Sequence, residues 1–469
     1  MAALRGLVLV LCCGTFIVNA RDFPVNWRAV QPELLDYYRS LIRIDTSNPP
    51  GNETRAVNYL RQILDREHIA YQVFALNARR SNLVVRLKGN GTKRPLLLLG
   101  HTDVVGVDRS QWAVDPFAAT LREGWVLGRG SIDDKSHVAV SLMTMILLHR
   151  LRVPLDRDVI FLAEAGEEGT TRYGIDFLVQ QHWPEIAAEF ALAEGGQMTE
   201  RGSAVRYVEI TTTEKVVRPV RLVAHGIAGH GSQPRIDNAI VHLSAAIARL
   251  SRWQPPMRLN ATTRAWFASL ARISAPDDAF RYAHIADPAY SASIQEYMAQ
   301  REVASYALLR TTIAPTVIRG GFRANVIPSE AEATLDVRAL PDEDLTRLWA
   351  ELRRVIADPN VELKPVEPAS RPAAQPSRTD TEMYRALEHA QHTMFPGAVT
   401  LPAMSTGATD LAQLRARGVQ GYGYGPVMNE LSSIAGGGPH SDDERLREDS
   451  LYKMAEFLWR ALTEVAASN

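Results

Sequence analysis

The sequence predicts an α/β fold with a mostly parallel sheet, into which a smaller α+β domain is inserted. Short apolar runs such as 96–99 and 159–163 are typical of buried strands, and amphipathic segments with helical spacing alternate with them. Alternation of this kind favours parallel pairing. The pattern changes near residue 213 and returns after a Pro- and Ala-rich stretch at 365–376. We therefore expect the larger domain at 21–212 and 367–469, and the inserted domain at 213–366.

Residues 1–20 have the composition of a secretory signal peptide. Arg5 supplies a positive charge, an apolar segment follows over 7–18, and small residues close the segment as they do at cleavage sites. The only two cysteines of the chain, Cys12 and Cys13, lie inside it. We expect an exported protein, periplasmic or extracellular, whose mature part has neither disulfides nor cysteine ligands.

The net charge of the chain and the length of its apolar stretches argue against some classes of binding partner. The formal net charge of the 469 residues is −1, which argues against nucleic acid or an anionic membrane surface as the main partner. The apolar stretches are too short to span a membrane. The chain is long enough to bury a large core without covalent staples.

Apolar spacing and turn residues predict the elements in order. Helices are expected over 31–42, 54–66, 136–151, 238–253, 342–356, 381–394 and 450–466, and strands over 72–75, 83–87, 96–101, 159–163, 190–193, 216–224, 312–318 and 332–338. The stretch 255–310 has mostly helical spacing and carries no chemical motif. Gly-rich turns at 128–135 and 436–441 interrupt this pattern.

Polar residues follow several of the predicted buried strands. His101 and Asp103 follow one strand, Glu168 and Glu194 follow two others, and Asp133 lies on the Gly-rich turn. In open α/β sheets, ligands bind outside the carboxyl ends of the strands. A phosphate-binding loop is the competing interpretation of the turn, and its adjacent carboxylates argue against it because they would repel phosphate.

A ligand set without sulfur can be assembled from five of these residues. Its members are His101, Asp133, Glu168, Glu194 and His440. Imidazole with carboxylate suits zinc, with cobalt or manganese as substitutes. Five ligands exceed one tetrahedral site, and one shared Asp that bridges two ions resolves the excess. Two such ions would hold a hydroxide between them, and Glu167 is placed to take its proton.

These residues lie in stretches that resemble the M20 family of di-zinc metallopeptidases and aminoacylases, of the carboxypeptidase G2 and aminoacylase-1 type. The matching stretches are 100–103, 130–135, 167–169, 193–195, 229–234, 325–328 followed by Arg338, 407–410 and 439–441. They occur in the family's order over nearly the whole mature chain. The resemblance implies a zinc-peptidase-like catalytic domain and an inserted lid of the dimerisation type.

The resemblance also implies individual roles. Asp133 would bridge two zinc ions, His101 and Glu194 would complete one site, and Glu168 and His440 would complete the other. Glu167 would be the general base and acid. Asp103 would orient His101 or adjust the properties of the site without itself binding metal.

Further roles fall on the predicted lid and on one loop. His230 would help to stabilise the oxyanion, and in dimeric members this histidine comes from the partner subunit. Asn325 and Arg338 match positions that hold the substrate's carboxylate, a task that suits arginine. Gly407 and Thr409 match a substrate-pocket loop. A homodimer through the lid is one expectation, and an enlarged lid that takes the partner's place is the alternative.

The sequence therefore predicts an exported di-zinc hydrolase that cleaves an amide next to a free carboxylate. N-acyl-amino acids, dipeptides and the C-terminal residues of small peptides are the candidate substrates. An aminopeptidase or another amidohydrolase on the same scaffold is one alternative, against which Arg338 argues. A metal-stabilised binding protein is the other, and it would have no need of Glu167.

Overall fold

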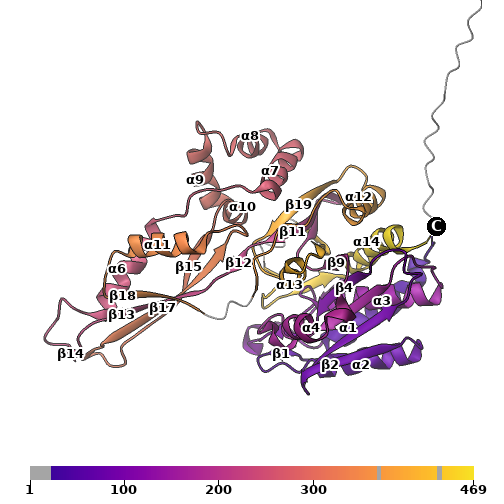
Figure 1. Cartoon of the computed structure of the whole chain (residues 1–469), viewed down its shortest axis with the longest axis horizontal. Helices are drawn as coiled ribbons and strands as arrows, with labels where there is room; N and C mark the ends of the chain where they lie inside the picture. Colours follow the sequence, from indigo (N-terminus) through magenta and orange to yellow (C-terminus); the bar gives the residue numbers. More distant parts are fainter. Residues whose placement is uncertain (1–22, 367–370, 430–435, 469) are drawn as a thin grey trace, which may run out of the picture.

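The computed structural model describes residues 23–366, 371–429 and 436–468. The signal peptide expected at 1–20 lies outside the described residues. Figure 1 shows two modules side by side, one around a large sheet and one around a smaller sheet. Among the described helices, none has the length and apolar character needed to cross a membrane.

A mixed ten-stranded sheet is the centre of the first module. Its strand order is β2 (Tyr71–Asn77), β3 (Arg80–Leu87), β8 (Val159–Glu164), β4 (Leu96–His101), β9 (Phe190–Ala193), β20 (Gln420–Gly423), β11 (Ala204–Glu214), β10 (Gln197–Arg201) and β21 (Val427–Asn429), with β19 (Val399–Ser405) beside β11. Five of the nine pairings are parallel, including both pairings of β4. Antiparallel pairs occur where the chain turns straight back, as in the β2–β3 and β10–β11 hairpins.

Helices cover both faces of this sheet. One face carries α1 (Trp27–Ile42), α2 (Thr54–Arg66), α3 (Lys135–Arg150), α12 (Glu382–Met394) and α14 (Glu448–Ala466), and the other carries α4 (Ile175–Gln181), α5 (Trp183–Ile186) and α13 (Leu411–Ala416). Alternate residues of β4 point to opposite cores: Leu96 and Leu98 to the first, Leu97 and Leu99 to the second. Burial on both faces explains why this strand is a continuous apolar run.

The second module has its own sheet and core. The sheet order is β12 (Val216–Val217), β17 (Glu330–Ala339), β13 (Val220–His225) and β18 (Val361–Pro365), with β15 (Thr312–Gly320) also pairing β17. Helices α6 (Ala239–Arg252) and α11 (Leu345–Ile356) pack on it. A two-stranded ribbon of β14 (Gly229–His230) and β16 (Val326–Ile327) lies at the far tip (Figure 1). The domain boundaries at 213 and 366 stay a prediction.

The stretch 255–310 forms four helices that pack on the first module. They are α7 (Ala261–Ile273), α8 (Pro276–His284), α9 (Ser291–Arg301) and α10 (Val303–Leu308). Their buried cluster includes Trp266 and Leu270 from α7 together with Leu401 and Met404 from β19. Although these helices lie between α6 and β15 in the sequence, they extend the first module's core.

Small ribbons complete the first module around the ends of its central strands. They are formed by β1 (Ser47–Asn48) with β5 (Val104–Val105), and by β6 (Thr120–Arg122), β7 (Trp125–Leu127) and β22 (Arg445–Arg447). The β7–β22 pairing joins a segment before Asp133 to one that follows His440.

Candidate metal centre and active site

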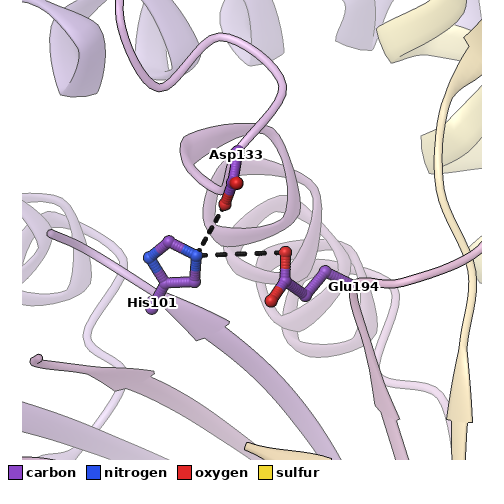
Figure 2. Close-up of side chains that lie close together, drawn as sticks. All are labelled: His101, Asp133 and Glu194. Carbon is purple, nitrogen blue, oxygen red and sulfur yellow. Dashed lines mark hydrogen bonds and ion pairs between the residues drawn. The ribbon is translucent and has the colours of Figure 1, made fainter. Parts of the chain in front are cut away.

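The parallel strands β4 and β9 bring two of the predicted ligands together. β4 ends at His101, and Glu194 directly follows β9, so both side chains lie at the carboxyl edge of the sheet. His101 Nε2 is 2.8 Å from Asp133 Oδ1 and 3.9 Å from Glu194 Oε2. Figure 2 shows the two carboxylates pointing toward this ring nitrogen.

The second oxygen of Asp133 belongs to another group of three. Asp133 Oδ2 is 3.1 Å from His440 Nε2, which lies 2.9 Å from Glu168 Oε1. Within each group the potential ligand atoms are no more than 4.8 Å apart. The two groups share Asp133, as the sequence pattern requires of a bridging carboxylate.

The electrostatics of this cluster favour cations. Burial raises the pKa of Glu194 well above its ordinary value, and the charge of Asp133 adds to the effect. Burial likewise raises the pKa of Glu167. Hydrogen bonds to Asp133 and Glu168 raise the pKa of His440 to about 10. Several carboxylates buried together are costly without compensating positive charge, and oxygen and imidazole donors suit two divalent ions.

Asp103 holds the turn that carries the Glu pair. Its carboxylate accepts hydrogen bonds from the backbone N–H groups of Gly166 at 2.9 Å and of Glu167 and Glu168 at 3.2 Å. Its backbone carbonyl lies 3.0 Å from His101 Nδ1. Burial opposes ionisation of Asp103, but hydrogen bonds, first of all with His101, lower its pKa. Asp103 thus positions one imidazole and the turn together.

Glu444 is a functional residue that the sequence analysis missed. Its fully buried carboxylate accepts hydrogen bonds from Arg129 at 2.7 Å and from the backbone N–H groups of Ile132 at 2.8 Å and Asp133 at 3.2 Å. Arg129 also donates to the carbonyl of His440 at 3.3 Å. This ion pair therefore joins the Asp133 turn to the His440 loop. In the sequence Glu444 is one acid in a short charged run, which gives no signal.

Arg371 is the second residue that was missed. It lies in the predicted Pro-rich return segment and forms an ion pair with Glu167 and, at 3.0 Å, with Asp410. The guanidinium group therefore links Glu167 to Asp410, the residue that immediately precedes α13. An isolated arginine among prolines and alanines carries no sequence pattern that would single it out.

The predicted pocket loop lies beside the cluster. Thr409 is buried and donates through Oγ1 to Glu214 at 2.8 Å. Its methyl group is 3.5 Å from where a Cβ of Gly195 would lie, next to Glu194. Gly407 is exposed, and its N–H donates to Ser405 Oγ at 3.1 Å.

The predicted lid residues lie apart from the cluster in this conformation. His230 is exposed on β14, and the N–H of Gly231 donates to the carbonyl of Asn325 at 2.8 Å, so His230 and Asn325 share the far tip. Figure 1 places β14 at the far tip of the second module, away from the module that contains β4 and β9. Arg338 is half-buried elsewhere on β17, where its Nε donates to Asp336 at 2.8 Å.

Two linked groups of histidine and carboxylate at the carboxyl edge of an α/β sheet define a candidate two-metal hydrolase centre. The chain belongs to the peptidase family M20/M25/M40, whose family model matches residues 97–464. It is therefore a hydrolase of the peptidase and amidohydrolase type. This membership confirms the family that the sequence motifs indicated.

Similar proteins include one curated relative and two solved structures. The chain is 28% identical over 325 residues to the human N-fatty-acyl-amino acid synthase/hydrolase PM20D1, a match that covers 68% of this chain and 64% of that protein. The M20 family metallo-carboxypeptidase Sso-CP2 from Sulfolobus solfataricus has a TM-score of 0.68 at 17% identity, over 92% of this chain and 99% of that one. Bacillus subtilis YXEP, described as a dinuclear metal binding peptidase of the M20 family, has a TM-score of 0.59 at 17% identity, over 93% and 98%.

Proposed function

We propose that this protein is a zinc-dependent hydrolase that cleaves N-acyl-amino acids at the amide bond next to a free carboxylate. The observation that carries the proposal is the pair of ligand groups that share Asp133, with Glu167 beside them. The acyl-amino-acid class is supported by the similarity to an N-fatty-acyl-amino acid synthase/hydrolase. Export of the mature chain is also proposed, on the composition of residues 1–20.

In this proposal His101 and Glu194 would hold one ion, Glu168 and His440 would hold the other, and Asp133 would serve both. Bound ions would polarise the amide carbonyl and lower the pKa of water toward ~7. The Glu167 carboxylate accepts the proton of the attacking water and donates it to the leaving nitrogen. Its ion pair with Arg371 keeps the carboxylate oriented for both transfers. The products are a carboxylic acid and an amino acid.

Recognition of the substrate's carboxylate is proposed for Arg338. Its ion pair with Asp336 holds the guanidinium in place on β17. Closure of the second module over the first would bring it to the substrate. Asn325 would assist, and His230 would stabilise negative charge on the carbonyl oxygen.

The first prediction concerns the free carboxylate. Purified protein with added zinc should cleave N-acyl-amino acids and should not cleave their carboxyl-amidated forms. Arg338→Met should lower kcat/KM for the free-carboxylate substrates by about 10–100-fold, because a charge-assisted contact is lost. Steady-state kinetics on matched free and amidated substrates, with dipeptides included, makes the comparison.

The matched control is Arg347→Met, since Arg347 is exposed on α11. It should leave kcat/KM unchanged. Equal cleavage of amidated substrates would contradict the role of Arg338 and favour an aminopeptidase. Cleavage of dipeptides in preference to acyl-amino acids would contradict the proposed substrate class. Removal of metal with a chelator should abolish activity, and zinc should restore it.

A homodimer through the second module is also proposed. β15 pairs with β17 alone among the described strands, so its other edge presents unpaired backbone groups. Apolar side chains beside this edge are exposed: Val317 by 43%, Ile318 by 61% and Phe322 by 80%. Pairing of two copies here would bury this patch. The same pairing would bring His230 of one copy toward the active site of the other, because His230 lies far from the active site of its own chain.

We expect Ile318→Lys to convert a dimer into a monomer, because two lysines would meet at the paired edges. Sedimentation velocity over a range of protein concentrations measures the change. Leu151→Lys, at an exposed position of the first module, is the control and should leave the dimer intact. If the unmodified protein is a monomer, the proposal is contradicted. The alternative, in which the enlarged lid occupies the place of a partner subunit, is then favoured.

A further inference from the structure

A cavity of about 950 Å³ lies between the first sheet and the helices α7–α10. One end of it is lined by Gly195 and Gly196, which directly follow Glu194, and by Ser405 and Thr406 at the end of β19. Small-molecule sites commonly have volumes of ~300–1,000 Å³. The cavity therefore begins within one residue of a proposed metal ligand and continues away from it under the inserted helices.

Two glycines form the end of the cavity beside Glu194. Gly195 has φ +112°, a conformation that other residues rarely adopt. A Cβ on Gly196 would lie 2.3 Å from the carbonyl oxygen of Glu209 and 2.6 Å from that of Gly423. Neither position accepts a side chain without rearrangement, so the end of the cavity next to Glu194 is formed by backbone.

One part of the cavity wall is apolar. Trp266 and Leu270 of α7, Leu308 of α10 and Met404 of β19 line it, and all four belong to one buried hydrophobic cluster. Glu209 is a half-buried carboxylate of the lining, and it accepts a hydrogen bond from Trp266 Nε1 at 2.9 Å. The other charged lining residues are Arg201, Arg206, Asp278, Arg301 and Glu302; the three arginines are exposed and the two carboxylates are half-buried.

We propose that this cavity receives the linear aliphatic acyl chain of the substrate. The inference rests on the proposed function, because hydrolysis of an N-acyl-amino acid places the acyl carbonyl at the metal centre and the chain beyond it. An aliphatic chain needs no hydrogen-bond partner from the wall. A peptide in the same place would bring backbone N–H and C=O groups, which the apolar part of the wall would leave unpaired at a cost. Helices α7–α10 are thus a specificity element.

The first test is the dependence on acyl length. We expect kcat/KM of the zinc-loaded protein to rise from N-acetyl- through N-hexanoyl- to N-dodecanoyl-leucine. Each methylene group that the cavity buries should raise it by up to about fourfold until the cavity is filled. The same value for all three substrates would overturn the inference while leaving the proposed hydrolysis intact.

The second test fills the cavity. Ala304 lines it from α10 at an exposed position, so an indole there can enter the cavity without displacing the core. We expect Ala304→Trp to lower the ratio of kcat/KM for dodecanoyl over acetyl substrate at least about tenfold, as overpacking does. Ala268→Trp is the matched control, since Ala268 is exposed on α7 away from the cavity lining, and it should keep the ratio of the unmodified protein.

The outcomes separate the two proposals. If both substrates are cleaved and Ala304→Trp leaves the ratio unchanged, the cavity does not hold the acyl chain and the proposed function stands. A preference for N-terminally extended peptides over acyl chains would also overturn the inference. If no N-acyl-amino acid of any length is cleaved by protein with zinc bound, the proposed function fails and this inference fails with it.

Discussion

Glu167→Gln is expected to lower kcat by about 10²–10⁴-fold, which is the range for loss of a general acid–base group. Glutamine keeps the size and shape of the side chain but cannot accept the proton of the attacking water. The ligand groups do not include Glu167: the neighbouring Glu168 is the one whose oxygen lies 2.9 Å from His440. The zinc content of the variant should therefore stay at that of the unmodified protein.

The measurement is kcat on an N-acyl-amino acid, with metal analysis of the same sample. Glu296→Gln, at an exposed position on α9, supplies the control for loss of one negative charge and should be fully active. An unchanged kcat in Glu167→Gln would contradict its role as the base. Loss of zinc together with activity would show that Glu167 helps to hold metal instead.

Glu444→Gln is expected to lower the free energy of unfolding by about 3–5 kcal/mol, the usual effect of removing one partner of a buried ion pair. The substitution leaves the Arg129 guanidinium, which is only 2% exposed, without its carboxylate. Because the same carboxylate accepts the N–H of Asp133, metal affinity should also fall, by about 10–100-fold as for other residues that support ligands.

Urea unfolding of metal-free and zinc-loaded protein, with zinc titration, tests both effects. Glu456→Gln is the matched control, because Glu456 pairs with Arg460 on the partly exposed face of α14 at 2.6 Å. A pair of this kind contributes at most about 1 kcal/mol. Equal small losses in the two variants would show that the Arg129–Glu444 pair does not anchor the Asp133 turn.

The central strands and the ligand cluster could be predicted from the sequence. The run 96–101 predicts a buried strand and corresponds to β4, since burial on both faces demands apolar residues throughout. The carboxyl ends of parallel strands share one edge, so residues that follow such runs lie close together. His101 and Glu194 do so through β4 and β9.

Other parts of the site and the fold depend on contacts between residues far apart in the sequence, which no local sequence pattern predicts. Arg371 meets Glu167 across 204 residues, and Arg129 meets Glu444 across 315. β19 contains Pro402, which weakens the strand signal in the sequence. The helices of 255–310 were expected as helices, but their packing on β19, and the cavity that this packing creates, follow from the tertiary structure alone.

The large sheet of the first module is assembled from two chain segments that flank the second module, and this has a consequence for synthesis on the ribosome. The second sheet, from Val216 to Pro365, is complete before His440 emerges. Domains generally fold as units during translation, beginning with those synthesised first. Until β20 arrives, β9 has an open edge, and until Glu444 arrives, Arg129 has no carboxylate partner. Four of the five proposed ligands are synthesised before the second sheet, but His440 and Glu444, which holds the turn of Asp133, follow it. Hydrolytic competence is therefore acquired last.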